Sequence, residues 1–359
     1  MPGHERQHSL KRNKKIEVGI LGATGTVGQQ FAALLADHPW FRLTWLAASE
    51  RSAGKRYGEL PWRLPAPLAE EFAALRVEAL RPGTAPRILF SALDSSIAGD
   101  AEREFAAAGH FVVSNSRNHR MDPLVPLLIP EINADHLGLV PLQQKKEGWR
   151  GAIVTNPNCS AIALSLALAP LRAFELRRVI VTTLQALSGA GYPGVASLDA
   201  TANVIPYIEG EEEKIEVETR KILGRLAKGG IELHSAAISA TSTRVPVING
   251  HTESVSVELG KNTERDDLLA AFSIFSGEPQ KLRLPSAPAR PIVYMDAPDR
   301  PQPRLDAERG GGMAVYVGRL RYCHVLSYKF VVLGHNTIRG AAGAALLNAE
   351  LMVAKKLVD

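Results

Sequence analysis

Three glycines near the N-terminus constrain what this chain can fold into more than any other feature. Gly22, Gly25 and Gly28 follow the apolar run of residues 16–21 and precede residues 29–36, whose apolar side chains recur with helical spacing. A glycine loop between a strand and a helix is typical of a βαβ unit that binds a dinucleotide. The first glycine would form the tight turn, the second would admit a pyrophosphate, and the third would let the helix and the strand pack closely.

The same loop and the start of its helix supply the contacts that we expect for the cofactor. The N-terminus of a helix offers unpaired N–H groups and a positive dipole end to phosphates. We therefore assign cofactor binding to six residues of this loop: Gly22, Thr24, Gly25, Thr26, Val27 and Gly28.

Short apolar runs recur through the first part of the chain, with segments of helical spacing between some of them. Continuous apolar runs are typical of parallel strands that are buried on both faces, and their alternation with helices predicts a doubly wound parallel sheet in an α/β domain. The expected elements are strands at residues 42–48, 88–91, 111–114 and 152–155 and a helix at residues 99–108.

The end of the second expected strand indicates which dinucleotide is bound. An NAD site places an acidic residue there to bind the ribose 2′-hydroxyl, whereas an arginine accommodates the 2′-phosphate of NADP. Ser49, Arg51 and Ser52 suit a 2′-phosphate, which an arginine holds by charge-assisted hydrogen bonds. Glu50 is the opposing signal, because it would repel that phosphate if it turned inward and would then select NAD. We predict NADP.

From about residue 151 the pattern changes to longer runs rich in β-branched residues, with few helices between them. This pattern predicts an α+β domain with a mostly antiparallel sheet. Residues 284–312, rich in Pro, Arg and Gly, are expected to form an ordered loop or a subunit contact, and residues 336–357 a helix that returns to cover the first sheet. The expected strands are residues 178–187, 236–245, 253–259, 314–321 and 327–333.

These elements divide the chain into two domains, as its length of 359 residues favours. Residues 1–15 are expected to be a disordered basic tail. Residues 16–157 would form a Rossmann-type dinucleotide-binding domain, completed by a C-terminal helix at residues 336–359. Residues 158–335 would form a catalytic and oligomerisation domain.

Composition narrows the class of protein. A hydrophobic fraction of 45% and a charged fraction of 22% are typical of a globular chain with a proper core. Part of the net charge of +5 lies in the basic tail, and no aromatic platform accompanies it, so we expect no nucleic-acid partner. We expect no membrane association, because no apolar run reaches the roughly 18 residues that span a bilayer. Two separated cysteines favour a reducing cytoplasm, and the absence of metal-binding motifs predicts no metal.

Cys159 stands where a strand and the turn of residues 155–158 lead into an expected helix at residues 159–171. Asn158 suits the N-cap position, which places Cys159 in the first helical turn. The positive helix end favours the thiolate over the thiol, and nearby N–H groups can hold an oxyanion. The alternative is a buried, inert cysteine, and we assign that role to Cys323, within the expected strand of residues 320–328.

A thiol nucleophile needs a proton acceptor, and His251 has the most suitable context of the ten histidines. Gly250 permits a bend that would aim the imidazole into a cleft, although an ordinary turn histidine fits the pattern as well. Gln185, before a glycine-rich stretch, is a candidate for substrate binding, and Arg244 for binding a carboxylate, unless it is a solvated strand residue. Together with a dinucleotide, these groups predict a thioester that receives a hydride and yields an aldehyde.

Taken together, these motifs resemble the aspartate-semialdehyde dehydrogenases, most of all their archaeal and fungal branch. The resemblance implies NADPH-dependent reduction of L-aspartyl 4-phosphate to L-aspartate 4-semialdehyde and phosphate, on the route to lysine, methionine and threonine. It also implies a cytoplasmic homodimer or homotetramer. The segments that carry the resemblance are the glycine loop and residues 155–160, 185–194, 244–253, 310–314 and 336–343.

The resemblance also implies a role for each site residue. Cys159 is the nucleophile, His251 the acid and base, and Gln185 the orienting amide. Glu211 would meet the substrate α-amino group and Arg244 its α-carboxylate. By spacing alone, a solvated helix face is the better explanation of Glu211 and Lys214, which stand three residues apart. The remaining roles are phosphoryl binding by Lys214 and Arg120, with Arg117 as the alternative to Arg120, substrate binding by Asn158, and cofactor contacts by Ser188, Gly189 and Asn336.

Two related enzymes and two other classes of protein are the alternatives. Malonyl- or succinyl-CoA reductases share the fold and the covalent chemistry but release a bulky thiol, and they need no acid for an amine. N-acetyl-glutamyl-phosphate reductases should also lack a carboxylate for a free amine. A nucleotide sensor would have no use for Cys159 at a helix start, and a cysteine hydrolase would leave the glycine loop without a function.

Overall fold

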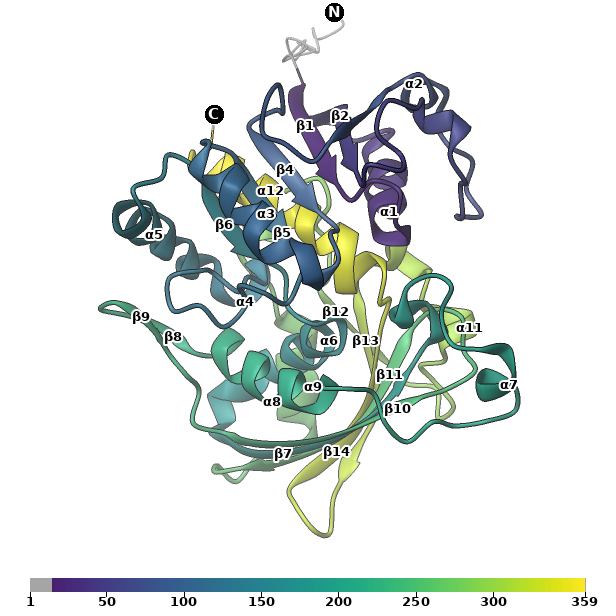
Figure 1. The fold of residues 1–359 in the computed structure, drawn as a ribbon. Coiled ribbons are helices and arrows are strands. Elements are labelled where there is room, and N and C mark those ends of the chain that lie inside the picture. The colour runs from purple at the N-terminus through teal and green to yellow at the C-terminus, as the bar shows by residue number, and fades with distance from the viewer. Residues whose placement is uncertain (1–14, 359) are drawn as a thin grey trace, which may run out of the picture.

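The structure is a computed structural model that describes residues 15–358. The basic tail expected at residues 1–15 therefore lies, except for its last residue, outside the described part of the chain. Two six-stranded sheets dominate the fold, one in the upper half of Figure 1 and one sweeping along the bottom.

The first sheet is parallel throughout, as its continuous apolar runs predict, and its strand order is β3-β2-β1-β4-β5-β6. Strands β2 and β3 follow β1 on one side of it, and β4, β5 and β6 lie on its other side. The strand order therefore reverses beside β1, and sheets of this kind bind ligands at that point. The expected strands are confirmed to within one residue. The bounds are Ile16–Leu21 (β1), Phe41–Ala48 (β2), Val77–Ala79 (β3), Ile88–Ser91 (β4), Phe111–Ser114 (β5) and Ala152–Thr155 (β6).

Helices cover both faces of this sheet, which confirms the doubly wound architecture. Val18 and Ile20 of β1 share one core with α1 (Thr26–Leu35) and with the C-terminal helix α12 (Gly343–Ala354). Leu21 points to the other face, into a second core with α3 (Ser95–Ala107). Helix α3 begins four residues before the expected start, because the carboxylate of Asp94 accepts the N–H of Ser96 and caps it there.

The second sheet has the order β10-β7-β11-β14-β13-β12. Its three inner pairs are antiparallel as expected, but each edge strand is parallel to its neighbour. A parallel pair needs a long crossover, and the segment between β7 and β10, which includes a helix, provides one. The bounds are Leu176–Gln185 (β7), Ala237–Arg244 (β10), His251–Leu259 (β11), Ile292–Met295 (β12), Val315–Tyr322 (β13) and Tyr328–Gly334 (β14).

Three helices, α6 (Cys159–Leu168), α8 (Glu211–Ile222) and α9 (Arg265–Ile274), lie on the upper face of this second sheet (Figure 1). Helix α6 is shorter than the expected 159–171, because Pro170 lacks an N–H and the chain tightens into a 3₁₀ turn at Ala169–Phe174. On the opposite face, Ile180 and Leu184 of β7 are 50% and 37% exposed.

The C-terminal segment returns to the first sheet as predicted, although its regular helix is shorter than residues 336–357. Residues Ile338–Ala342 form a wide π-helical turn, and α12 continues from Gly343 to Ala354. Small residues line the segment, and Ala342, Ala345 and Ala349 pack in the same core as β1.

Two smaller expectations need correction. Cys323 lies in the turn between β13 and β14, half-buried, where its sulfur accepts the N–H of Leu326, so it does not sit inside a strand. Residues 284–312 are ordered but contain β12 and a short helix, α11 (Pro303–Asp306). In residues 15–358, no helix has both the length and the apolar character that crossing a bilayer requires. Shorter elements are α2 (Glu70–Ala73), α4 (Pro130–Asn133), α5 (Leu139–Glu147), α7 (Ser197–Ala200), α10 (Glu278–Leu282), β8 (Arg225–Ala227) and β9 (Gly230–Glu232).

Candidate active site

The glycine loop has the geometry that a dinucleotide requires. Gly22 adopts a φ of 78°, a conformation that side chains disfavour. A Cβ at Gly28 would collide with the carbonyl oxygen of Gly22, so only glycine lets α1 start this close to β1. Gly25 is exposed, and no side chain caps α1, so the first N–H groups of the helix are open to a phosphate. Thr24, Thr26 and Val27 complete the loop, half-buried around this opening.

The residues expected to select the cofactor lie directly after β2. Ser49, Glu50 and Arg51 are exposed, Ser52 is half-buried, and the N–H of Ser52 donates to the carbonyl oxygen of Ser49 in a turn. The turn stands at the carboxyl end of β2, the edge where the glycine loop also opens. Arg51 and Glu50 both remain free to meet a ribose in this arrangement, so the choice between them stays a prediction.

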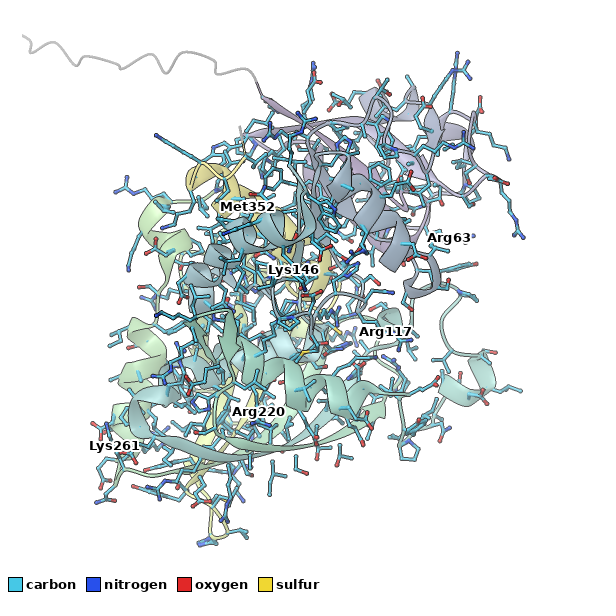
Figure 2. All side chains as sticks on the ribbon, turned by 60° about the vertical axis from the view of Figure 1, so that its left-hand side comes forward. Arg63, Arg117, Lys146, Arg220, Lys261 and Met352 are labelled. Carbon is cyan, nitrogen blue, oxygen red and sulfur yellow. The ribbon has the colours of Figure 1, made fainter. Side chains whose placement is uncertain are left out.

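A cavity of about 360 Å³ opens between the first sheet and the helices of the second. Its walls come from the ends of β4 and β5, the start of α6, one end of α8, and the loop that contains Ser188 and Gly189. In Figure 2 one of its lining residues, Arg117, lies where the two halves of the molecule meet. Of the residues expected at the site, the cavity is lined by Val27, Arg117, Arg120, Asn158, Cys159, Ser188, Gly189, Glu211, Lys214 and Asn336.

Cys159 begins α6, and Asn158 caps this helix as predicted. The side-chain oxygen of Asn158 accepts the N–H groups of Ser160 and Ala161 at 2.9 and 3.1 Å. The sulfur of Cys159 lies 3.2 Å from Nε2 of His251, across 92 residues of sequence. A sulfur and an imidazole nitrogen at this distance form a hydrogen bond, which supports a cysteine nucleophile.

Burial opposes the thiolate that the positive helix end favours at Cys159. Burial of the sulfur and then the charge of Glu211 raise the pKa of Cys159 to about 12, although Arg120 and the N–H of Ser160 oppose them. Burial and then the charge of Arg244 lower the pKa of His251 to about 3. Both groups are therefore neutral at neutral pH, and the thiol loses its proton during the reaction instead of before it.

His251 is held in place at the first position of β11. Gly250 precedes it with a φ of 96°, which supplies the expected bend, and its N–H donates to the side-chain oxygen of Asn336 at 2.8 Å. The backbone N–H of Ala186 donates to Nδ1 of His251 at 3.0 Å and orients the ring. The amide of Asn336 in turn donates to the hydroxyl of Ser188 at 2.7 Å, which joins the His251 strand to the cofactor side of the cavity.

Gln185 and Arg244 end the neighbouring strands β7 and β10, where they are paired in register. Arg244 is buried and donates to the carbonyl oxygen of Ala186 at 2.7 Å, so it is not a solvated strand residue. The amide of Gln185 is buried as well, and it donates to Glu211 at 3.1 Å and to Thr183 at 3.3 Å. The ends of adjacent strands thus present an arginine, an amide and an imidazole side by side.

Glu211 is buried at the start of α8, so the alternative of a solvated helix face is wrong for it. Its carboxylate accepts hydrogen bonds from Asn158 at 2.7 Å and Gln185 at 3.1 Å, and from Lys214 at 3.2 Å. Burial alone would raise the pKa of Glu211, but the hydrogen bond from Asn158, the charge of Lys214 and the hydrogen bond from Gln185 together lower it. The cavity therefore contains a charged carboxylate suited to an ammonium group.

The two candidate arginines differ in their surroundings. Arg120 is buried, and its guanidinium donates to Glu218 at 3.0 Å and to the carbonyl oxygen of Asn115 at 2.8 Å. Arg117 is exposed at the cavity. Both reach the cavity, so the assignment of the phosphoryl group to Arg120 stays a prediction. Glu218 itself was not among the expected residues; its only sequence signal is that it stands seven residues, two helical turns, after Glu211.

Comparison with known proteins places this geometry in a family. Residues 17–140 match the family described as semialdehyde dehydrogenase, NAD binding domain, and residues 168–339 match semialdehyde dehydrogenase, dimerisation domain. The aspartate-semialdehyde dehydrogenase of Archaeoglobus fulgidus is 49% identical over 346 residues, which cover 96% of this chain and 100% of that protein. The chain belongs to the aspartate-semialdehyde dehydrogenase family.

One solved structure and one further relative are also similar to this chain along nearly its whole length. The crystal structure of aspartate-semialdehyde dehydrogenase with NADP from Candida albicans has a TM-score of 0.88 and 40% identity, covering 96% of this chain and 100% of that chain. The malonyl CoA reductase (NADP) of Metallosphaera sedula is 39% identical over 354 residues, covering 96% of this chain and 99% of that protein. The resemblance to the archaeal and fungal aspartate-semialdehyde dehydrogenases and the expected fold class are therefore confirmed.

Proposed function

We propose that this chain is an NADP-dependent aspartate-semialdehyde dehydrogenase. It would reduce L-aspartyl 4-phosphate to L-aspartate 4-semialdehyde and phosphate, a reaction that leads toward lysine, methionine and threonine. The observation that carries the proposal is the contact of 3.2 Å between the sulfur of Cys159 and Nε2 of the buried His251, beside a cavity that Cys159 and Glu211 both line. The similarity to the Archaeoglobus fulgidus enzyme supports it.

The chemistry follows from the groups around the sulfur. As Cys159 attacks the acyl carbon, phosphate leaves with the bonding electron pair and takes up the thiol proton, and a thioester remains. Nδ1 of His251 accepts the N–H of Ala186, so Nε2 of the neutral ring carries its proton and donates to the sulfur. NADPH, when bound, supplies the hydride that reduces this acyl group to the aldehyde level. The N–H of Nε2 then faces the charge that forms as the sulfur departs, and a proton from solvent restores the resting thiol.

The charges of the site match the three charged groups of the substrate. Glu211 is a buried carboxylate, fit to bind the α-amino group, and the guanidinium of Arg244 is fit to bind the α-carboxylate. Lys214 and Arg120 are cations on the cavity wall for the phosphoryl group. Asn158 and Gln185 hold Glu211 in place, and Asn158 also lines the cavity beside the sulfur.

NADP as the cofactor rests on the glycine loop and on the turn after β2. The six residues of the loop, Gly22 to Gly28 without Ala23, would hold the pyrophosphate, and Ser49, Arg51 and Ser52 the 2′-phosphate. Ser188, Gly189 and Asn336 would lie beside the nicotinamide end, because they line the same cavity as Cys159. The NADP complex of the Candida albicans relative supports this choice.

A homo-oligomer is the assembly that we propose. The outer face of the second sheet exposes Ile180 and Leu184 between polar neighbours, and an exposed apolar patch on a sheet suits a second copy. The domain that contains this sheet matches a family described as a dimerisation domain. We also propose domain boundaries at residues 157/158 and 335/336, and a cytoplasmic location, where Cys159 would stay reduced.

The test follows NADP reduction with L-aspartate 4-semialdehyde and inorganic phosphate as substrates. The wild-type chain should reduce NADP only when phosphate is present, and Cys159→Ser should abolish the reaction while Cys323→Ser leaves it unchanged. Turnover of malonyl-CoA or succinyl-CoA with NADPH, faster than turnover of the aspartyl substrate, would assign the chain to the acyl-CoA reductases instead. Release of a carboxylic acid without any change in NADP would refute both assignments.

A further inference from the structure

Helix α8 carries four charged residues on one face: Glu211, Lys214, Glu218 and Lys221. Their spacing of three, four and three residues keeps them on one side of a helix. Glu211 and Lys214 line the cavity at the start of the helix. Glu218 and Lys221, two turns further on, are only 2% and 3% exposed, so they are neither solvated nor part of the cavity wall.

Glu218 joins two parts of the site that are far apart in sequence. One carboxylate oxygen accepts the backbone N–H of Asn158 at 2.6 Å, directly before the nucleophile Cys159. The other oxygen accepts a hydrogen bond from Nη1 of Arg120 at 3.0 Å. Both members of the Arg120–Glu218 pair are buried, so the pair is shielded from solvent and holds a defined geometry.

Lys221 fixes the backbone of the segment that carries Arg120. Its ammonium group donates to the carbonyl oxygens of Arg120, Asp122 and Val125 at 2.7, 2.8 and 3.0 Å. These three bonds use all three donors of a lysine. Arg120 is thus anchored at its backbone by Lys221 and at its guanidinium by Glu218.

The anchored guanidinium still has donors to offer. An arginine has five N–H groups, and Arg120 uses one on Nη1 for Glu218 and one on Nη2 for the carbonyl oxygen of Asn115. Its Nε is buried and finds no hydrogen-bond partner among residues 15–358. Buried donors without a partner are costly, so this arginine, on the wall of the cavity, is prepared to receive an anion.

We propose that Glu218 is a positioning residue that holds Arg120 ready for the phosphoryl group and, at the same time, fixes the turn that presents Cys159. The role rests on the proposed function, because the anion is the phosphate that enters and leaves in that reaction. Glu218 acts through Arg120 and Asn158 and touches no reacting atom.

The test is Glu218→Gln, which keeps an oxygen for the N–H of Asn158 but removes the charge that pairs with Arg120. In the direction that consumes inorganic phosphate, the KM for phosphate should rise roughly tenfold, about what one charge-assisted hydrogen bond contributes. The KM for NADP should not change, and kcat should fall by less than about threefold because the turn at Asn158 is kept. A general loss of folded structure would instead change all three values together and overturn the proposal.

Glu216→Gln is the matched control. Glu216 lies on the same helix and also accepts one backbone N–H, that of Ala240 at 2.9 Å, but it faces β10 and not the cavity. This variant should leave the KM for phosphate unchanged. Equal effects of Glu218→Gln and Glu216→Gln would show that Glu218 has only a structural role.

A double-mutant cycle with Arg120→Gln tests the coupling. Once Arg120 is gone, the loss of Glu218 should raise the KM for phosphate no further, because residues of one network are not additive. Effects that multiply would mean that Glu218 acts on phosphate by another route and would overturn the proposal.

A second readout needs no turnover. Inorganic phosphate bound beside Cys159 should slow its alkylation by iodoacetamide, and the phosphate concentration that halves the rate should rise roughly tenfold in Glu218→Gln. If wild-type protein failed to oxidise the semialdehyde but this shift occurred, the proposed function would be wrong and the positioning of Arg120 would stand. If turnover occurred but neither the KM for phosphate nor the protection shifted, only the role of Glu218 would be wrong.

Discussion

Gly340 is the residue behind the nucleophile, and adding one methyl group there should disable the site without unfolding the chain. A Cβ at Gly340 would lie 2.6 Å from the Cβ of Cys159 and 3.1 Å from its Cα. Ordinary carbon contacts begin near 3.5 to 4.0 Å, so Cys159 would have to move by about 1 Å. The sulfur would then leave its contact of 3.2 Å with His251.

The expected loss of stability in Gly340→Ala is small, whereas the expected loss of activity is large. Overpacking of this kind costs about 1 to 3 kcal/mol, and the better helix propensity of alanine returns about 0.5 to 1 kcal/mol. Gly340→Ala should therefore lower the free energy of unfolding by about 2 kcal/mol or less. A displacement of about 1 Å at a reacting group costs roughly a hundredfold in rate, so kcat/KM should fall by about that factor.

The assay compares Gly340→Ala with Gly343→Ala, one turn further along the same segment. A Cβ at Gly343 would meet the sulfur of Met313, a flexible side chain outside the cavity, and would lie 3.0 Å from both Cγ2 and the carbonyl oxygen of Ile338. Urea unfolding should show a loss of stability in both variants, whereas only Gly340→Ala should lose kcat/KM with semialdehyde, phosphate and NADP. A wild-type kcat/KM in Gly340→Ala, or a loss no greater than that in Gly343→Ala, would contradict this prediction.

Three further predictions follow from the charges of the structure. Because the pKa of Cys159 is about 12, its alkylation rate in the free protein should rise about tenfold per pH unit from pH 7 to 10. Mass spectrometry measures this rate, and a plateau below pH 9 would contradict the prediction. Burial raises the pKa of Glu102 from 4.5 to about 7, so its stabilising effect is complete below pH 4.5 and is lost as the pH rises through 7. At 1.36 kcal/mol per pKa unit, the free energy of unfolding should fall by about 3 kcal/mol between pH 4.5 and 7.5. Urea unfolding over this pH range should show the fall in the wild-type chain but not in Glu102→Gln. An equal fall in both would exclude Glu102 as its source. Arg51→Ala should raise the KM for NADPH at least roughly tenfold and leave that for NADH unchanged, whereas equal effects on both would remove Arg51 from the 2′-phosphate site.

The longer apolar strands of the first sheet could be located from sequence, whereas β3, with two of its three residues exposed, was not expected. The runs at β4, β5 and β6 are apolar without interruption, and the structure places them at the residues expected. The start of α3 was missed, because Asp94 caps the helix within a run of polar residues that carries no apolar periodicity. The parallel edge strands of the second sheet also escaped prediction, because strand direction is set by the path of the crossover and not by the pattern within a strand.

For the site, the sequence identified the residues but not their state. The contact of Cys159 with His251 followed from motif and context, whereas the neutral resting thiol depends on burial and on Glu211, 52 positions away in the sequence. A helix start favours a thiolate by a modest amount, and desolvation in a closed cavity opposes it more strongly. Glu218 had no sequence signal beyond its helical spacing, because the role of a buried carboxylate depends on the residues that it contacts in the fold.

The neutral thiol gives the charge of Glu211 a second consequence. The carboxylate that is suited to the substrate ammonium group also raises the pKa of Cys159. This carboxylate accepts a hydrogen bond from the side-chain amide of Asn158, the residue before Cys159. In the proposed reaction, a bound α-ammonium group cancels that negative charge at the moment when the acyl carbon reaches the sulfur. Burial, the larger cause of the raised pKa, remains, and the substrate carboxylate and phosphoryl group offset the positive charges of Arg244 and Arg120 that lower it. The α-ammonium group therefore removes only the part of the shift that Glu211 causes, and an acyl-CoA without an amine would leave that part in place.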